Sequence, residues 1–519
     1  MGTRLLRLLL ALGLVAASLA SLSSVGLATE PDRLYLPWVV NGVEIEDPRG
    51  FETLGPFYAT VTVHNPSNEQ ILVNFSATES GVLEPFLGHL LEPYESRTLT
   101  AHELGVPEGT GSGVVMQGET IVGQDPMPIT AVLKQSSPVP QGTGATTSSD
   151  HVTTAGYSAL VPGDVGDQVV LPIAQTNNNW NTLIRVTHFE DGPNDLVIHL
   201  NLHEAAGGGT LGPFVANVDA GGTATFDLLE LGVPEEFIGS AVVTAEWGIA
   251  AAAERVKNET KMLIMNTSRR VPGPGSEQSA PLAFREWFNW NTGISVANLS
   301  DQENEIIVRF YDADGIEVET EVLTIPANGM DFIFMPSGSG AEPFVGSALI
   351  EAEHAFVGAV DKVKYLGDHD DTGHAMSYMV DPAYAEAGER LSMPLYQKGS
   401  TVTGGGDTSG IQLFNPTHLP VEYTYSIWDQ DGDHLPFIFA TATLSPKENV
   451  TVYAFELDFI PDDFTGSFVV HIESGGGMAG ISNNVNYDAQ YDGSASFNMI
   501  VIKEPWEPPQ PPNGIIIAP

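Results

Sequence analysis

The strongest constraint on the fold is that the chain repeats itself. The hexapeptide Glu-Leu-Gly-Val-Pro-Glu occurs at residues 103–108 and again, unchanged, at 230–235. A looser copy follows at 456–461, and a chance match of six identical residues is improbable. Self-similarity at a fixed period is the sequence signature of a repeat architecture. We therefore expect several copies of one structural unit.

Two further elements recur in the same order, each in four copies. One is a Gly-Ser pair within an apolar strand, and the other is a short apolar segment upstream of it, typically Val-x-Asn. The Gly-Ser pairs lie at 111–112, 239–240, 346–347 and 466–467, and the upstream segments at 63–66, 186–189, 296–299 and 413–416. A proline beside an apolar residue opens each copy, and these prolines are 135, 109 and 113 residues apart. We predict four domains, which span 32–168, 169–279, 280–391 and 392–503.

The clearest strand pattern surrounds an Asp-Gly pair at 314–315. The apolar positions before the pair are Ile306, Val308 and Phe310, and those after it are Ile316, Val318 and Val322, which alternate with Glu317, Glu319 and Glu321. Period two on both sides of Asp-Gly predicts a hairpin with one buried apolar face and one solvated acidic face. Similar short apolar runs recur throughout, with little helical periodicity. The predicted fold class is all-β, with four tandem immunoglobulin-like β-sandwich domains.

The N-terminus has the pattern of a secretory signal peptide. Arg4 and Arg7 form a basic region, a largely apolar run follows to Ala20, and cleavage is expected after Ala20 or Ala28. An uncleaved membrane anchor is the alternative, although the run is shorter than the roughly 20 residues that a span needs. We predict a signal peptide at 1–28, no membrane span after cleavage, and a secreted or extracellular protein that is free or associated with the cell surface. The proline-rich tail at 504–519 is expected to be extended.

The charge and the absence of cysteine exclude several classes of protein. Lys+Arg number 20 and Asp+Glu number 66, so the formal net charge is −46. A nucleic-acid partner is excluded on this ground, because binding requires a basic face. With Cys 0, neither disulfides, thiol chemistry nor cysteine-ligated zinc is possible. A secreted protein without disulfides fits a bacterial exterior better than an animal one.

Two acidic segments contain the donors of a metal site. Asp429, Asp431 and Asp433 alternate as in half of a calcium loop, in which carboxylates converge on one cation. A plain hairpin turn is the favoured interpretation, because Asp and Gly are common turn residues. The second segment, whose donors suit a divalent transition metal, contains Asp368, His369, Asp370 and His374. A solvated acidic loop is the favoured interpretation of this segment, and no cofactor is expected apart from weakly bound Ca²⁺.

Two tryptophans are candidates for stacking on a sugar ring. Trp180 and Trp290 each open a Trp-Asn-Thr segment just before a strand, in the second and third repeats. Recurrence at one position also fits a packing role at the end of the sandwich. No Gly-x-Ser-x-Gly nucleophile elbow, P-loop or zinc-protease motif occurs, so no catalytic or cofactor-binding residue is predicted.

The Phe-x-Gly-Ser-Ala strand at 344–348, the Trp-Asn-Thr segment at 290–292 and the Val-x-Asn strand at 296–298 resemble repeats of a known kind. They are similar to repeats in secreted bacterial multi-domain surface proteins built of tandem immunoglobulin-like β-sandwiches. The resemblance covers the second and third repeats best, and Trp-Asn-Thr is absent from the first and the last. It implies an exported, modular and non-catalytic protein and carries over no catalytic residue.

The leading hypothesis is a non-catalytic, secreted or cell-surface protein with a structural or adhesive role. Other surface proteins or a polysaccharide are the expected partners. The first alternative is an extracellular array of carbohydrate-binding modules, and the second is a secreted hydrolase whose site no motif reveals.

Overall fold

The computed structural model describes residues 32–79, 82–85, 88–138, 151–189, 195–271, 277–335, 342–366, 371–401, 406–435, 441–487, 489 and 492–503. Within these ranges the secondary structure consists of β-strands and three short 3-10 helices, so the predicted all-β class is confirmed. No helix in this part of the chain is long and apolar enough to cross a membrane. The predicted signal peptide (1–28) and proline-rich tail (504–519) lie outside the described residues.

The strands fall into four successive groups, which we call units 1 to 4. Unit 1 contains β1 (Arg33–Ile45), β2 (Leu54–His64), β3 (Ile71–Glu79), β4 (Val82–Pro85), β5 (His89–Leu91), β6 (Ser96–Thr100), β7 (Thr110–Thr120), β8 (Thr130–Pro138) and β9 (His151–Ser158). Unit 2 contains β10 (Gly166–Gln175), β11 (Asn181–His188), β12 (Leu196–Glu204), β13 (Thr210–Val218), β14 (Thr223–Asp227), β15 (Ile238–Lys257), β16 (Met262–Thr267) and β17 (Arg269–Arg270).

Unit 3 contains β18 (Glu277–Arg285), β19 (Trp290–Asn298), β20 (Asn304–Tyr311), β21 (Glu317–Ile325), β22 (Met330–Met335), β23 (Phe344–Ala352), β24 (Phe356–Leu366) and β25 (Asp371–Met379). Unit 4 contains β26 (Arg390–Lys398), β27 (Thr408–Phe414), β28 (Val421–Asp429), β29 (Ala442–Leu444), β30 (Asn449–Tyr453), β31 (Phe464–Gly475), β32 (Ala479–Val485), β33 (Ser494–Asn498) and β34 (Ile500–Ile502). The 3-10 helices are η1 (Pro162–Asp164), η2 (Asn258–Thr260) and η3 (Ala454–Glu456).

One antiparallel pairing order recurs in all four units. In unit 3 the two sheets have the orders β18-β23-β20-β21 and β22-β19-β24-β25. Unit 4 repeats both orders, with β34 added beside β26. In unit 1, β1 pairs with both β7 and β2, and in unit 2 the long β15 pairs with strands of both layers. A single strand that passes between the layers therefore joins the two sheets of each of these units into one.

Alternation of side chains builds the core of each unit. In β12, Leu196, Ile198, Leu200 and Leu202 are at most 3% exposed, and the residues between them face outward. Successive residues of a strand point to opposite faces, so a period of two buries one face. The repeated Gly-Ser pair has a packing reason, because a Cβ on Gly346 would clash with the carbonyl oxygen of Tyr311 on the neighbouring strand.

The hairpin predicted around the Asp-Gly pair is confirmed, but its second strand faces the other way. β21 pairs antiparallel with β20, with Glu319 opposite Phe310 and Glu321 opposite Val308. Directly opposite residues of an antiparallel pair lie on the same face. Both glutamates therefore lie on the side of the buried Phe310 and Val308, and the expectation that they form the solvated face is wrong.

A register shift between Phe310 and Tyr311 accounts for this reversal. A slip of one residue moves every following side chain to the opposite face. Val318 and Val322 are consequently 45% and 53% exposed on the outer face. β21 is an edge strand, and inward-pointing charges such as Glu319 protect an edge from pairing with other chains.

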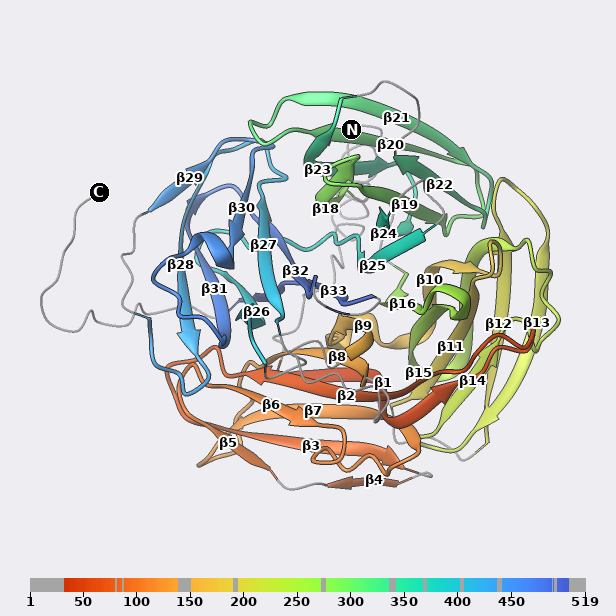
Figure 1. Ribbon diagram of the computed structural model, residues 1–519, viewed down its shortest axis with the longest axis horizontal. Helices are drawn as coiled ribbons and strands as arrows, with labels where there is room; N and C mark the ends of the chain where they lie inside the picture. The colour runs from red at the N-terminus through yellow and green to blue at the C-terminus, as the bar shows by residue number, and fades with distance from the viewer. Residues whose placement is uncertain are drawn as a thin grey trace, which may run out of the picture.

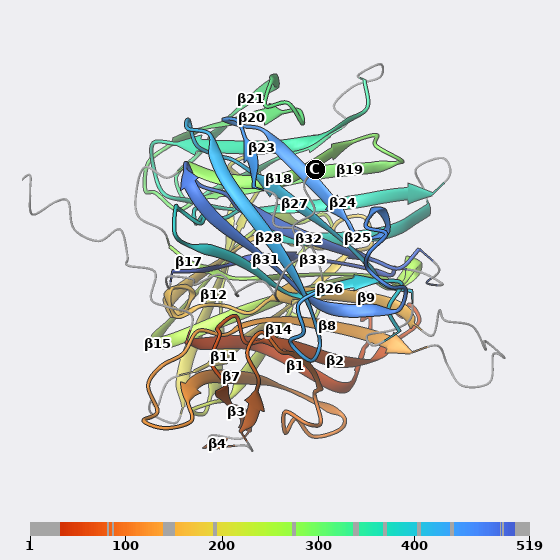
Figure 2. The same cartoon turned by 90° about the vertical axis from the view of Figure 1, so that its left-hand side faces the viewer.

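The four units close into a ring. Figure 1 shows them around a common axis, with β9, β16, β25 and β33 nearest the centre. β9 contacts β16 and β33, and β25 contacts the same two strands, so the innermost strands form an unbroken cycle. In both views β4 of unit 1 and β21 of unit 3 lie at opposite extremes of the molecule (Figure 2). Because β9 belongs to unit 1 and β33 to unit 4, their contact brings the first and last units together.

Candidate functional site

The calcium candidate lies in a hairpin turn. Asp429 Oδ1 accepts hydrogen bonds from the backbone N–H groups of Asp431 at 3.0 Å and Asp433 at 2.9 Å. The turn also docks on unit 1, where the N–H of Ser96 donates to the carbonyl of Gln430 at 3.1 Å. Throughout the described ranges, no group of three or more His, Cys, Asp or Glu side chains is placed to hold a metal ion. The geometry is that of a plain hairpin turn that holds two units together.

The second metal candidate is described only in part. Three of its residues lie outside the described ranges: Asp368, His369 and Asp370. His374 lies on β25, is 6% exposed, stacks on Trp290 at 6.1 Å and meets Tyr487 edge to face at 5.4 Å. Burial lowers the pKa of His374 from 6.5 to about 4, and the charge of Lys364 acts in the same direction. The described part of this segment is a neutral imidazole packed between aromatic rings.

The two candidate tryptophans occupy different environments. Trp290 is 4% exposed and lies in the core of unit 3 beside Phe284, at a centroid distance of 6.1 Å. Its buried indole has no free face for a sugar. Trp180 is half-buried and packs against an apolar cluster of units 2 and 3 that contains Met262, Ile264 and Ala375. Both positions fit the packing role that was the alternative to sugar binding.

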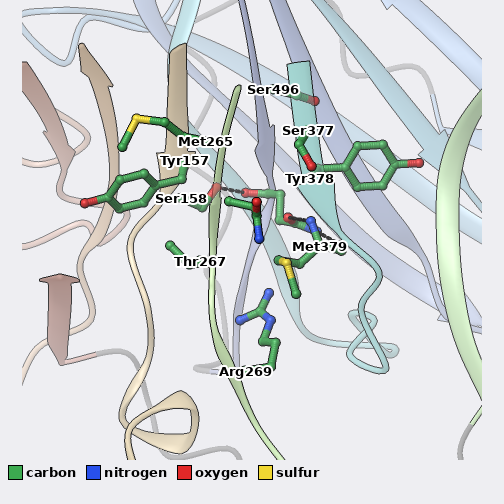
Figure 3. Close-up of a pocket in the computed structure, with 11 residues that line it drawn as sticks. Tyr157, Ser158, Met265, Thr267, Arg269, Ser377, Tyr378, Met379 and Ser496 are labelled. Atoms are coloured by element: carbon green, nitrogen blue, oxygen red, sulfur yellow. Dashed lines mark hydrogen bonds between the residues drawn. The ribbon is translucent and has the colours of Figure 1, made fainter. Parts of the chain in front are cut away.

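A small polar cavity lies between the four innermost strands (Figure 3), with a lining drawn from all four units. Its volume is about 10 Å³, close to the space needed for one water molecule. The rings of Tyr157 and Tyr378 point away from it to opposite sides in Figure 3. Their hydroxyls donate to the carbonyls of Trp38 and Leu282, each at 2.7 Å, and burial raises the pKa of both tyrosines. The cavity is too small for a substrate.

Two polar side chains in this lining have buried atoms without a hydrogen-bond partner among the described residues. Both amide atoms of Asn266 and the hydroxyl of Ser377 are buried without a hydrogen bond. Buried polar groups of this kind are normally satisfied by protein or by ordered water. One water molecule in the cavity would supply such a partner.

A polar contact crosses each junction between units around this cavity. Two adjacent polar residues stand at the same register in each unit, and the pairs are Lys134-Gln135, Glu254-Arg255, Asp361-Lys362 and Asn483-Asn484. The second residue of each pair contacts the first residue of the pair in the next unit. These contacts join Gln135 to Glu254, Arg255 to Asp361, Lys362 to Asn483, and Asn484 to Lys134. The contacts form a closed cycle through the whole ring.

The contact between units 2 and 3 is a two-point ion pair. Arg255 is 0% exposed. Its Nη1 and Nη2 atoms donate to the two carboxylate oxygens of Asp361 at 2.6 and 2.5 Å. Planar, bidentate pairs of this type are among the strongest charge-assisted hydrogen bonds. Beside it, Glu254 accepts hydrogen bonds from Gln135 and from Arg185, both at 2.9 Å, so two junctions meet on β15.

The contact that closes the ring joins unit 1 to unit 4. Lys134 is 2% exposed, and its Nζ lies 2.6 Å from Asp407 Oδ2 and 2.8 Å from Asn484 Oδ1. Burial lowers the pKa of Lys134, and the charge of Asp407 opposes that effect. Lys362, at the junction of units 3 and 4, donates to Asn483 and, at 3.0 Å, to Ser496. Burial lowers the pKa of Lys362 well below its usual range.

Asp492, Ser494 and His374 are the residue types of a hydrolase triad, and they lie close together. Ser494 Oγ donates to Asp492 Oδ1 at 2.6 Å, whereas His374 Nδ1 is 3.9 Å from the same oxygen. In a catalytic triad the imidazole lies between the hydroxyl and the carboxylate. Burial raises the pKa of Asp492 and lowers that of His374, which disfavours an ion pair. The arrangement therefore does not activate the serine.

Asp492 instead connects three units. Its carboxylate accepts the N–H of Ala375 in unit 3 at 3.1 Å, and its carbonyl accepts the N–H of Thr154 in unit 1 at 2.6 Å. Asp492 itself precedes β33 of unit 4 and is 0% exposed. The chemistry-bearing groups near the axis thus form contacts between units.

Motif searching could not find this ring of polar contacts, because its members come from four distant segments. One signal was present in the sequence, however. Each polar pair interrupts a largely apolar strand at the same place in its repeat, directly after Leu133, Ala253, Val360 or Ser482. A buried charge at one register in several repeats points to a partner in a neighbouring repeat.

His64 is a buried titratable group beside the closing junction. It is 0% exposed, and its Nδ1 lies 3.2 Å from the carbonyl oxygen of Glu95 and 3.1 Å from Ser96 Oγ. Burial is the main cause that lowers the pKa of His64 from 6.5 to about 3; the hydrogen bond to Glu95 opposes this effect, and the charge of Arg390 in unit 4 contributes to it. A proton therefore binds His64 more tightly in the unfolded chain.

We expect the folded state to lose stability as the pH falls from about 6.5 to about 3, the unfolded and folded pKa values of His64. Above that window the contribution of His64 to the free energy of unfolding is fully present. Within the window the free energy of unfolding falls by about 1.4 kcal/mol per pH unit. Urea unfolding at a series of pH values measures the slope. The variant His64→Gln cannot titrate and should show a shallower slope by this amount. Equal slopes for the two proteins would contradict the assignment.

No protein-family model matches the chain, and no curated protein is significantly similar to it.

Proposed function

We propose that the chain is a secreted or cell-surface protein with a structural or adhesive, non-catalytic role, built of four tandem immunoglobulin-like β-sandwiches. Two antiparallel layers per unit, each built on four or five strands, in about 110–135 residues, fit that domain type. Because the first and last units are in contact, we propose that the four sandwiches act together as one closed ring. Other surface proteins or a polysaccharide are the proposed partners.

The observation that carries the proposal is the use of the polar groups near the axis. Lys134, Arg255 and Lys362 are at most 2% exposed, and each is bonded to a residue of a neighbouring unit. Catalytic groups need access to a substrate and a pKa suited to proton transfer. Buried contacts between units instead favour a rigid body whose outer surface is available for binding.

The two alternatives have less support. An array of carbohydrate-binding modules requires exposed tryptophans, and one of its two candidates, Trp290, is buried. The hydrolase required a pocket with a suitable acid, base or nucleophile. Among the described residues, the closest arrangement is the cluster of Asp492, Ser494 and His374, whose geometry does not fit.

Cell fractionation of a bacterial host that expresses the full chain with a C-terminal tag tests the proposal. We expect the protein in the medium or on the cell surface, with an N-terminus at Ser21 or Thr29. As a control, Leu10→Arg combined with Leu14→Arg interrupts the apolar run and should retain an uncleaved chain inside the cell. Cytoplasmic wild-type protein that keeps residues 1–28 would refute the proposal.

A further inference from the structure

The turn between β18 and β19 exposes two aromatic side chains. Trp287 is 39% exposed and Phe288 is 75% exposed. Their ring centroids are 5.3 Å apart and the ring planes meet at 79°, so the two rings form a corner. Large aromatic side chains at the surface are typical of binding sites, because leaving them in water costs free energy.

The backbone conformation of this turn is unfavourable for Phe288. The N–H of Trp290 donates to the carbonyl of Trp287 at 2.9 Å, and the reverse bond is 3.2 Å. Between them, Phe288 and Asn289 have φ angles of 48° and 68°. A two-residue hairpin turn with both φ values positive favours Asn and Gly. A bulky aromatic residue at positive φ is an outlier.

Unit 2 contains the same turn with a favourable sequence. The N–H of Trp180 donates to the carbonyl of Asn177 at 3.0 Å, and Asn178 and Asn179 have φ angles of 49° and 63°. The turn therefore forms without an aromatic residue at its tip. The fold does not require Phe288 in unit 3, and strain at an exposed position points to a function.

The charges around the corner indicate what it binds. Arg285, the cation at the start of the turn, pairs with Glu319 and donates to the carbonyl of Glu342 at 3.2 Å. Glu286 is exposed beside the aromatic pair, and the chain carries a net charge of −46. The faces of aromatic rings carry negative electrostatic potential and attract cations. An anionic membrane surface would be repelled by the same charge.

We infer that Trp287 and Phe288 form a binding site for a cationic side chain, lysine or arginine, of a partner protein. The two rings contact the cation and its alkyl stem, and Glu286 adds the complementary charge. This inference rests on the proposed adhesive role, for which it names the contact residues and the chemistry of the partner.

Binding of the mature full chain to immobilised peptides tests the inference. One peptide alternates Gly and Lys, and its control carries the same lysines acetylated, which removes their charge. We expect the wild-type protein to bind the first peptide, and the variants Trp287→Ala and Phe288→Asn to bind it about five- to tenfold more weakly. Both variants keep the net charge, so non-specific attraction to lysine stays equal.

Thermal melting separates binding from folding. Phe288→Asn should melt at or above the temperature of the wild type, because Asn is accepted at this position in unit 2. The matched variant Asn178→Phe should melt at a lower temperature. A lower melting temperature for Phe288→Asn would show a structural role and overturn the inference.

Two other outcomes would also overturn it. Equal binding by the wild type and both variants would mean that the overall charge alone attracts the peptide. Binding to a neutral glycan array that Trp287→Ala abolishes, without binding to the lysine peptide, would make the turn a sugar site. The fractionation experiment is independent: a secreted protein without this binding refutes the inference alone, and a cytoplasmic protein refutes the proposed function.

Discussion

Replacing Lys134 with methionine should lower the free energy of unfolding by about 3–5 kcal/mol, because it leaves the buried Asp407 without its cation. The ammonium lies 2.6 Å from Asp407 and 2.8 Å from Asn484. Methionine fills much of the space of the alkyl chain, so the loss reports the charge more than a cavity. Urea unfolding followed by tryptophan fluorescence measures it.

The control for this prediction removes both charges. In Lys134→Met with Asp407→Leu no buried charge remains unpaired, and most of the lost stability should return. Lys503→Met, at a position 37% exposed, should change stability by less than about 0.5 kcal/mol. A Lys134→Met protein as stable as the wild type would show that this contact does not hold the ring closed.

Arg255→Met should lower the free energy of unfolding by a similar amount, about 3–5 kcal/mol, because it leaves Asp361 at the junction without its cation. Arg255→Lys should cost less, although a lysine cannot reproduce the two parallel hydrogen bonds. The exposed Arg270 provides the matched control, and Arg270→Met should leave the urea midpoint nearly unchanged. Equal stability of Arg255→Met and Arg270→Met would show that the ion pair between Arg255 and Asp361 does not stabilise the fold.

Lys134→Met and Arg255→Met should also differ in the shape of the partly unfolded protein. Units 2 and 3 are consecutive in the chain and stay tethered when their ion pair is lost. Units 1 and 4 are connected only by non-covalent contacts and the three intervening junctions. Small-angle X-ray scattering in moderate urea should therefore show a larger radius of gyration for Lys134→Met than for Arg255→Met. The opposite order would contradict a ring closed between units 1 and 4.

The sequence predicted the all-β class and the hairpin of unit 3 because both depend on local patterns. A period of two and a turn glycine act within about ten residues. The same reasoning assigned the wrong face to Val318 and Val322, because a register shift after Phe310 depends on how the neighbouring strand pairs. It named Asp429 and Trp290 as candidate site residues next to a turn and a packing role, and the structure places Asp429 in a hairpin turn and Trp290 in the core of unit 3.

The candidate binding corner was missed for a different reason. Trp287 and Phe288 stand next to Trp290, and all three look equivalent in the sequence. Only the turn geometry distinguishes them, because it buries Trp290 to 4% exposure and leaves Phe288 75% exposed. The equivalent turn at 177–180 in unit 2 has Asn178 at the position of Phe288, so the fold does not need an aromatic residue there.

The sequence by itself determined the repeat, its order of elements and the strand character of each unit, since these follow from side-chain alternation, turn residues and the close approach of strands at glycine. The tertiary structure decided that the repeats form a ring and that the charges within their strands pair across its junctions. Lys134 and Asn484 are 350 positions apart, and no local pattern specifies such a contact. The physical reason is that a buried charge requires a partner, and only the packing of whole units determines which residue supplies it.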